Sequence, residues 1–247
     1  VYDVDSCKQR FLTNLDNTLR KSVKGQDRAI EELVNFTKRL RLGLIDNGKP
    51  TSFLFVGPTG VGKTMLAKEY SKALFGSDNF IRLDMSEYRD SASINKIIGS
   101  APGYVGYDDC RNKLEEIKNK PHSIILLDEI EKAHPTVLNL FLQVLDDGKI
   151  TDSKGNTIHL NHNIIIMTSN IGFNKEEVGF VCESSKEDSK LKEFLSLELL
   201  NRIQKVIYFN KLNKENITVI VKNKLNNIKK IFKEKKIKVH ISDNIIN

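Results

Sequence analysis

Apolar residues form five short runs along the chain, and segments with helical spacing separate most of them. The runs lie at residues 52–56, 80–84, 123–128, 163–169 and 206–209. Most are apolar at successive rather than alternate positions, which is typical of strands that are covered on both faces. Strands that alternate with helices favour a parallel sheet. The pattern therefore predicts an α/β fold in which helices flank a parallel five-stranded sheet.

Other segments repeat their apolar residues every three or four positions, which predicts helices. They cover residues 6–20, 26–42, 65–74 and 213–235. The last of these is rich in lysine, and a short strand-like run follows it at residues 237–241. We therefore expect a large α/β domain over residues 1–210, with a helical lead-in over residues 1–24. A partial helical small domain is expected over residues 211–247.

The composition is ordinary for a globular protein and excludes several function classes. Charged residues make up 29% and hydrophobic residues 39% of the 247 residues. No apolar run approaches the ~20 residues of a membrane span, so we expect no membrane partner. The net charge is +7, but aromatic residues do not alternate with the basic ones. We interpret the charge as scattered solvated lysines and expect no nucleic-acid partner.

The ends and the cysteines bear on origin and compartment. The chain begins Val-Tyr-Asp-Val-Asp, without Met or a signal-peptide pattern, so we expect it to be a piece of a longer protein. Cys7, Cys110 and Cys182 form no C-x-x-C pair and are odd in number, which favours a reducing compartment over a disulfide framework or zinc site. The abundance of Asn and Lys is the bias that AT-rich codons produce.

The most specific motif lies directly after the first apolar run. Residues 57–64 read Gly-Pro-Thr-Gly-Val-Gly-Lys-Thr, which fits G-x-x-x-x-G-K-[ST] between a predicted strand and a predicted helix. Such a loop presents backbone N–H groups to phosphates, while its lysine reaches the terminal phosphates and its last hydroxyl faces Mg²⁺. The motif predicts ATP and Mg²⁺ as ligands of Pro58, Thr59, Gly60, Val61, Gly62, Lys63 and Thr64.

Two carboxylates end the third apolar run. Asp128 and Glu129 follow the run Ile-Ile-Leu-Leu. Beside a phosphate loop, the first acid is suited to support Mg²⁺ with Thr64, and the second is suited to polarise a water aimed at the terminal phosphate. We therefore predict Asp128 as a Mg²⁺ and nucleotide residue, and Glu129 as a catalytic residue.

Three other features leave alternatives open on the residues alone. Asn170 ends the fourth run, where it could hold the attacking water or simply form a turn before Gly172. Arg202 could reach the terminal phosphate of a neighbouring subunit or be an ordinary surface arginine. The segment Gly103-Tyr-Val-Gly106 could be a tight turn or a loop that presents an aromatic ring to a ligand.

Together, these and several further motifs resemble the second AAA+ module of the Clp unfoldases. The resemblance rests on residues 57–64, 84–88, 103–107, 127–135, 142–148, 151–155, 167–170 and 200–203. It runs from about Ser6 to the C-terminus. It implies an AAA+ P-loop core, a truncated helical small domain and ATP-driven protein unfolding by a hexamer.

The resemblance implies further roles for individual residues. Asn170 becomes the first sensor, and Arg202 the finger that acts on the adjacent protomer. The side chains implied to grip substrate in the axial pore are Tyr104 and Val105, with residues 151–156 as a second pore loop. Those implied to lie against adenine are Val23 and Lys24.

Within this family the chain is most similar to the ClpC branch. Val178, Gly179 and Phe180 follow the first-sensor strand, where ClpC-type proteins carry a tripeptide that docks into a ClpP-type protease. The alternatives are a ClpB-type disaggregase, a nucleotide-dependent assembly module that does not hydrolyse ATP, and a DNA-remodelling ATPase. The ClpC resemblance and the codon bias together favour a plastid-like stroma, with the cytoplasm as the alternative. Unfolded or tagged proteins are the expected substrates.

The sequence also departs from the family pattern. Lys24 replaces an apolar residue, residues 110–113 replace Gly-Gly-Gln-Leu, and Ser196-Leu197 replaces Arg-Pro before the finger. The segment between Phe180 and Leu191 is short, so the helix that carries Arg202 is expected to be truncated or differently placed. The second-sensor Gly-Ala-Arg motif does not occur in these 247 residues.

Overall fold

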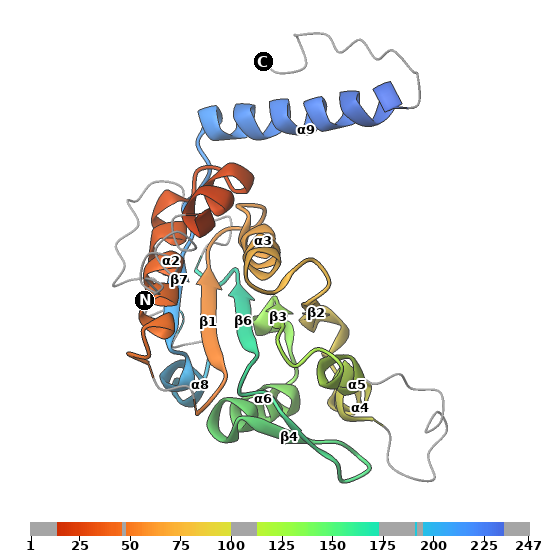
Figure 1. Cartoon of the computed structure of the whole chain (residues 1–247). Helices are drawn as coiled ribbons and strands as arrows, with labels where there is room; N and C mark the ends of the chain where they lie inside the picture. Colours follow the sequence, from red (N-terminus) through yellow and green to blue (C-terminus); the bar gives the residue numbers. More distant parts are fainter. Residues whose placement is uncertain (1–13, 46–47, 100–112, 173–190, 192–194, 235–247) are drawn as a thin grey trace.

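The computed structural model describes residues 14–45, 48–99, 113–172, 191 and 195–234. Its centre is a sheet of five parallel strands in the order β2-β3-β6-β1-β7 (Figure 1). The strands are β1 (Thr51–Val56), β2 (Phe80–Asp84), β3 (Ile124–Asp128), β6 (Ile164–Ser169) and β7 (Lys205–Tyr208). The prediction of a parallel five-stranded sheet is confirmed, and each predicted run matches one strand to within a residue at either end.

Helices cover both faces of this sheet. The described ones are α2 (Asp27–Arg41), α3 (Lys63–Phe75), α4 (Asn95–Ile98), α5 (Lys113–Lys118), α6 (Pro135–Asp147), α8 (Leu197–Arg202) and α9 (Lys214–Glu234). Helical residues 14–22 precede α2. Short 3₁₀ turns lie at η1 (Met85–Glu87), η2 (Ser91–Ile94) and η3 (Ile130–Lys132). Among the described residues the predicted helices are present, while α4 and α5 are too short to leave a periodic signal.

The alternation of side chains along each strand divides the core into two layers. Phe53 and Phe55 of β1 point to the side covered by residues 14–22, α2 and α3. Leu54 and Val56 point to the opposite side, which α4, α5, α6 and α8 cover. All four are fully buried. Burial on both sides is the physical reason why the strands are apolar at successive positions.

The order of the strands creates a crevice at the carboxyl ends of the strands. β1 lies between β6 and β7, but the chain leaves it for β2 at the far side of the sheet. In open parallel sheets, ligands bind beyond the carboxyl ends of the strands where such a reversal occurs. The loops after β1, β3 and β6 all open at this edge.

A small antiparallel hairpin extends from the opposite end of the body (Figure 1). It consists of β4 (Lys149–Thr151) and β5 (Thr157–His159). The sequence analysis expected a loop at residues 151–156, and this segment forms the turn of the hairpin. Asp152 organises the turn, because its carboxylate accepts hydrogen bonds from the backbone of Lys154 at 2.9 Å and of Asn156 at 2.7 Å.

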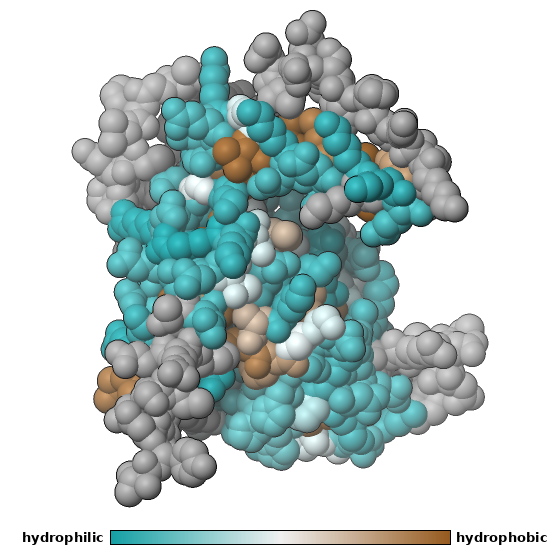
Figure 2. Space-filling model, turned by 45° about the horizontal axis from the view of Figure 1, so that its top comes forward, coloured by the Kyte–Doolittle hydropathy of each residue, from teal (hydrophilic) through white to brown (hydrophobic). Residues whose placement is uncertain are grey.

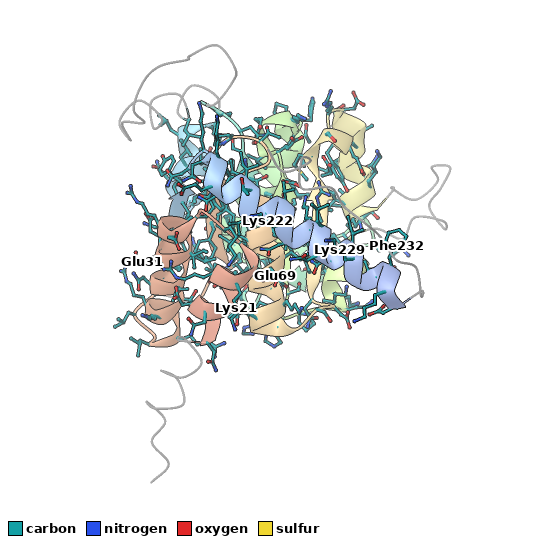
Figure 3. The ribbon with its side chains drawn as sticks, turned by 90° about the horizontal axis from the view of Figure 1, so that it is seen from above. Lys21, Glu31, Glu69, Lys222, Lys229 and Phe232 are labelled. Carbon is teal, nitrogen blue, oxygen red and sulfur yellow. The ribbon has the colours of Figure 1, made fainter. Side chains whose placement is uncertain are left out.

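Helix α9 crosses the body above the carboxyl ends of the strands. Seen from above, it runs diagonally over the molecule, with Lys222, Lys229 and Phe232 in succession along it (Figure 3). Its approach is close at Gly25, where a Cβ atom would lie 2.8 Å from Cγ of Asn216. Gly25 also has φ of +74°, so both space and backbone geometry favour glycine there.

The apolar residues of α9 are only partly covered. Figure 2 shows brown apolar atoms between teal hydrophilic ones where α9 crosses the top of the molecule. Exposed members are Ile217, Val219, Ile228, Ile231 and Phe232. No helix within the described ranges is long and apolar enough to cross a membrane. The division of the chain at residue 210 stays a prediction.

Candidate functional site

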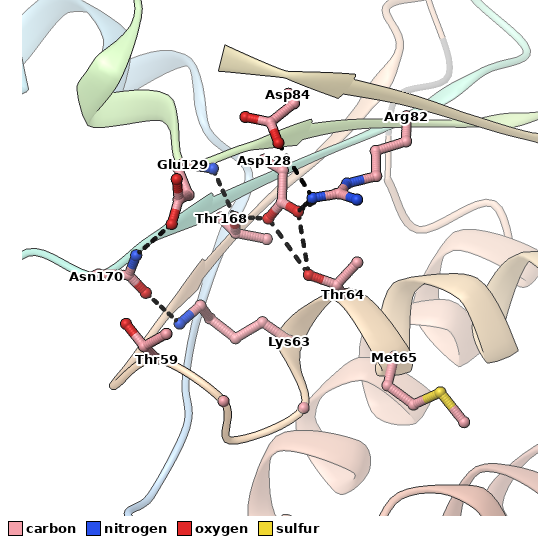
Figure 4. Close-up of a pocket in the computed structure, with 12 residues that line it drawn as sticks. Thr59, Lys63, Thr64, Met65, Arg82, Asp84, Asp128, Glu129, Thr168 and Asn170 are labelled. Atoms are coloured by element: carbon pink, nitrogen blue, oxygen red, sulfur yellow. Dashed lines mark hydrogen bonds and ion pairs between the residues drawn. The ribbon is translucent and has the colours of Figure 1, made fainter. Parts of the chain in front are cut away.

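A cavity of about 390 Å³ lies at the carboxyl edge of the sheet, beside the loop that follows β1 (Figure 4). Its lining comes from four segments that are far apart in the sequence. The residues are Thr59, Gly60, Gly62, Lys63, Thr64, Met65, Arg82, Asp84, Asp128, Glu129, Thr168 and Asn170. Six of the predicted nucleotide residues are therefore brought together with Glu129 and Asn170.

The loop side of the cavity is shaped by backbone geometry. Gly62 has φ of +110° and caps α3, which begins at Lys63. A side chain is rarely tolerated at this φ, so the motif glycine is required for the sharp entry into the helix. The unpaired N–H groups in the first turn of α3 give the cavity a partial positive charge. This arrangement favours a phosphate group at the mouth of the helix.

Lys63 lies against the loop that carries it. Its ammonium donates hydrogen bonds to the carbonyl oxygens of Gly57 at 2.6 Å and Pro58 at 2.8 Å, and to Oδ1 of Asn170 at 2.7 Å. Burial lowers the pKa of Lys63 from its usual 10.5 to about 8, although Glu131, Asp128 and Glu129 act in the opposite direction. The lysine is thus a desolvated cation whose three hydrogen-bond acceptors are neutral oxygens.

The acidic side of the cavity is organised around Asp128, which is buried at the end of β3. Its Oδ1 accepts a hydrogen bond from the Thr168 hydroxyl at 2.5 Å. Its Oδ2 accepts from Nε of Arg82 at 2.9 Å. The hydroxyl of Thr64 lies 3.3 Å from both carboxylate oxygens. Thr64 and Asp128 therefore face each other as a pair of oxygen donors, the ligand type that Mg²⁺ prefers.

Glu129 is held in an unusual backbone conformation directly after β3. Its φ of 58° and ψ of 57° lie in the left-handed region, which no other non-glycine residue of the described chain occupies. The backbone N–H of Glu129 donates to the Thr168 hydroxyl at 2.9 Å. Its carboxylate contacts Lys132 through Oε2 and the amide of Asn170 through Oε1, the latter at 3.3 Å. Strain of this kind is frequent at functional sites.

Asn170 joins the two sides of the cavity. Its oxygen accepts from Lys63 and its side-chain nitrogen donates to Glu129. A third carboxylate fixes its position, because the backbone N–H of Asn170 donates to Oε1 of Glu131 at 3.1 Å. The other oxygen of Glu131 is buried without a hydrogen-bond partner among the described residues. The nearby charge of Lys63 is the electrostatic compensation for this oxygen.

A second hollow of about 460 Å³ lies on the other side of the phosphate loop. It is lined by Pro58, Thr59, Gly60, Val61, Lys211, Leu212, Ile217, Ile220 and Val221. The two hollows share Thr59 and Gly60, so one ligand with a charged end and an apolar end could occupy both. The sequence analysis did not predict the contribution of α9, because helical periodicity identifies an apolar face without saying what it covers.

Two predicted adenine residues lie behind the phosphate loop. Val23 is buried, and its side chain lies 3.5 Å from the point where a Cβ of Gly62 would be. Lys24 donates through Nζ to the carbonyl of Arg20 at 2.7 Å. Neither of these described residues lines either hollow. Gln26 joins the region instead, since its side chain contacts the backbone of Val61 and of Asn210.

Arg202 lies far from the cavity. It is the last residue of α8, at the amino ends of the strands, and its Nε contacts Asp146 at 2.8 Å. Its side chain is 43% exposed. Ser196, one of the departures from the family pattern, caps α8 by accepting a hydrogen bond from the N–H of Leu199. The helix that carries Arg202 is therefore short but well defined.

Several predicted residues lie outside the described part of the chain. They are Tyr104 and Val105 of the first pore loop, and the tripeptide Val178, Gly179 and Phe180. The strand-like run at residues 237–241 also lies outside it. Their predicted roles stay predictions.

The sequence analysis did not single out several residues that line the cavity or contact its lining. Arg82, Thr168, Glu131 and Lys132 contact Asp128, Glu129 or Asn170. Glu131 and Lys132 follow Asp128 and Glu129 directly in the sequence, and this closeness is a signal that could have placed them at the site. Arg82 and Thr168 occupy positions in the interior of strands, where one polar residue gives no sign of its partner.

A sequence family described as the AAA domain of the Cdc48 subfamily matches residues 49–206, which is more than half of the chain. The chain belongs to this family. The match begins just before β1 and ends within β7, so the AAA domain coincides with the five-stranded sheet.

Relatives of this AAA domain come from the Clp proteins. The chain is 44% identical to the ATP-dependent Clp protease ATP-binding subunit ClpE of Streptococcus pneumoniae, over 99% of its own length and 34% of that protein. It is 45% identical to the chaperone protein ClpB of Clostridium tetani, over 94% of this chain and 28% of the relative. The Clp protease subunit ClpC of Staphylococcus epidermidis is 41% identical, over 94% and 30%.

The chain thus spans about a third of the length of these relatives, or slightly less. The solved closed state of Hsp104 with ATPγS and FITC casein matches with a TM-score of 0.80 and 38% identity, over 92% of this chain and 40% of that chain. The expected likeness to a Clp-type AAA+ module is confirmed. The identities to ClpB and to the protease subunits are similar, so they do not distinguish the two branches.

Proposed function

We propose that this chain is the ATP-hydrolysing module of a Clp-type protein unfoldase. One observation carries the proposal: the residues expected to bind phosphate and those expected to activate water converge on the same cavity at the carboxyl edge of the sheet. The names of the relatives, an ATP-binding protease subunit and a chaperone, support an ATP-driven action on proteins.

In this proposal the loop side binds the triphosphate. The N–H groups of residues 58–64 surround the phosphate oxygens, and the ammonium of Lys63 neutralises the terminal phosphates. Lys63 exchanges its contacts with Gly57 and Pro58 for the stronger charged oxygens of the nucleotide. The second hollow accepts the base, with Leu212, Ile217 and Ile220 as apolar contacts.

The acidic side activates water. Glu129 accepts a proton from the attacking water or orients it, and the side chain of Asn170 fixes that water from the neighbouring strand. Thr64 and Asp128 fit Mg²⁺ because they are adjacent oxygen donors at the mouth of the cavity. When bound, Mg²⁺ would neutralise charge on the phosphate oxygens.

Assembly into a hexamer gives Arg202 its role. Its position at the far end of the sheet excludes contact with the phosphates of its own subunit, so it would act on a nucleotide bound by a neighbour. An arginine supplied in this way is worth ~10³–10⁵ in rate in other nucleotide hydrolases. The ion pair with Asp146 would hold the side chain until a neighbour is present.

The finer proposals concern what the hexamer acts on. Tyr104 and Val105 would grip an extended protein substrate in the axial pore, together with the turn at residues 151–156. Val178, Gly179 and Phe180 would dock into a ClpP-type protease ring. Without such docking, the same module would serve a ClpB-type disaggregase. A plastid-like compartment rests on codon bias and family resemblance, whereas the named relatives are bacterial.

A substitution of Glu129 tests the proposal in the full-length protein. Glu129→Gln should keep nucleotide affinity within about twofold but lower turnover by at least about 10²-fold, because it removes only the proton acceptor. Glu31→Gln on the exposed face of α2 is the matched control and should leave both unchanged. Turnover at the parental rate in Glu129→Gln would refute the role of Glu129, and loss of unfolding without loss of turnover would refute the coupling.

A further inference from the structure

Arg82 is the one cationic side chain besides Lys63 among the residues that line the cavity. It projects from β2, the strand at the edge of the sheet. Its Nε and a terminal nitrogen contact Oδ2 of Asp128 at 2.9 and 2.7 Å, and the same terminal nitrogen lies 3.4 Å from Asp84 (Figure 4).

The register of the strands explains why a cation is needed here. Asp84 and Asp128 are directly opposite each other on β2 and β3. Two like charges in this arrangement repel each other. Arg82 lies two residues before Asp84 on the same face of β2, so its guanidinium reaches both carboxylates. It therefore offsets a repulsion that the site would otherwise contain.

The contacts of Arg82 also occupy the oxygen donors of Asp128. Oδ1 accepts from Thr168 and Oδ2 accepts from Arg82. A divalent cation supported by Asp128 needs electron pairs of this carboxylate and is repelled by a guanidinium against it. Arg82 and Mg²⁺ would thus compete for the carboxylate of Asp128. The side chain of Arg82 is 50% exposed, so it can leave Asp128 without becoming a buried unpaired charge.

We propose that Arg82 is the counter-ion of Asp128 in the metal-free site and is displaced from it when Mg²⁺ and nucleotide bind. This inference rests on the proposed function, because it takes Asp128 as a residue that supports Mg²⁺. It makes Arg82 a positioning residue: it keeps the carboxylate of Asp128 in place and sets the Mg²⁺ concentration at which the site fills.

The test is a Mg²⁺ titration of the full-length protein with a fluorescent ADP, which requires no turnover. Arg82→Gln removes the competing charge and should lower the half-saturating Mg²⁺ concentration about 1.5-fold to fivefold, the range expected for a partly exposed ion pair. Arg82→Lys keeps the charge but loses the two-nitrogen contact, so its value should be intermediate. Arg28→Gln, which breaks the exposed pair with Glu32 on α2, is the matched control and should match the parent.

A second measurement needs no nucleotide. In EDTA, Arg82→Gln should melt at a lower temperature than the parent, since Asp84 and Asp128 then repel each other. Added Mg²⁺ should narrow that difference. A half-saturating Mg²⁺ concentration that is unchanged or higher in Arg82→Gln would overturn the inference, and so would unchanged melting in EDTA. If the parent protein binds no nucleotide, the proposed function itself fails, which is a separate outcome.

Discussion

The two sides of the cavity are built by different means. On the loop side, Gly62 and the start of α3 determine the shape through backbone geometry, and Lys63 rests mainly on backbone carbonyls. On the acidic side, the backbone of β3 brings Asp128 and Glu129 to the edge. Side chains from other strands and from the following turn then determine their orientation.

This difference determines how each side responds to change. A loop shaped by its backbone should keep its form when one side chain is removed, so the loss is confined to the interaction that the side chain makes. A carboxylate held by several side chains should lose its orientation when one of them is removed. Substitutions on the loop side are therefore expected to affect binding, and those on the acidic side are expected to affect turnover.

The largest effect is expected from Lys63→Ala. The loop should remain folded, but the terminal phosphates lose their cation, and nucleotide affinity should fall at least about 100-fold. Lys68→Ala on the exposed face of α3 removes the same charge from the same helix and should leave affinity unchanged. Calorimetry with a non-hydrolysable ATP analogue measures both. Retained affinity in Lys63→Ala would show that the backbone cradle alone suffices.

An intermediate effect is expected from Thr168→Val. One buried hydroxyl donates to Asp128 and accepts from the N–H of Glu129, so valine removes one hydrogen bond from each at nearly unchanged volume. Asp128 keeps its contacts with Arg82 and Thr64. Turnover should fall about 10- to 100-fold, and stability by about 1–3 kcal/mol. Nucleotide affinity should change by less than about threefold.

Thr37→Val provides the control for Thr168→Val. Thr37 is also buried, and its hydroxyl contacts Leu33 and Tyr70 away from the cavity. This variant should lose stability while turnover is preserved. Thr168→Ser should restore turnover. Equal turnover in Thr168→Val and the parent would show that side-chain contacts do not orient the acidic pair.

The smallest effect on nucleotide affinity is expected from a change of pH that deprotonates Lys63. Because the pKa of Lys63 is lowered to about 8, the free protein loses this charge above pH 8. Nucleotide affinity should then decrease by up to about tenfold per pH unit. The sign for stability is opposite. Between about pH 8 and 10.5 the unfolded chain binds the proton that the folded chain has released, so the free energy of unfolding rises with pH.

Denaturant titrations at pH 7.5 and 9.5 measure the contribution of Lys63 to this rise. Lys63→Ala should reduce the rise, since the titrating group is then absent. An equal rise in parent and variant would show that burial does not perturb this lysine.

The same contrast explains what the sequence could predict. The strands were predictable because burial on both faces leaves consecutive apolar residues, as in β1 and β6. The phosphate loop was predictable because its function depends on glycine at fixed spacing. The hairpin β4–β5 was not, since strands of three residues carry no periodic signal.

The partners of the acidic pair were less predictable. Arg82 and Thr168 meet Asp128 only through the pairing of β2, β3 and β6, and a single sequence does not specify which strands are neighbours. The placement of Val23 and Lys24 beside adenine rested on family resemblance. That placement stays a prediction. The apolar hollow beside the phosphate loop is lined by Leu212 and by residues of α9, which crosses above that loop.

The left-handed backbone of Glu129 lowers the stability of the folded protein. A residue with a Cβ atom in this conformation costs about 1–2 kcal/mol, and glycine avoids most of that cost. Glu129→Gly is therefore expected to raise the free energy of unfolding, while it removes the carboxylate to which the proposed mechanism assigns the activation of water. Alanine at the same position gives no such advantage.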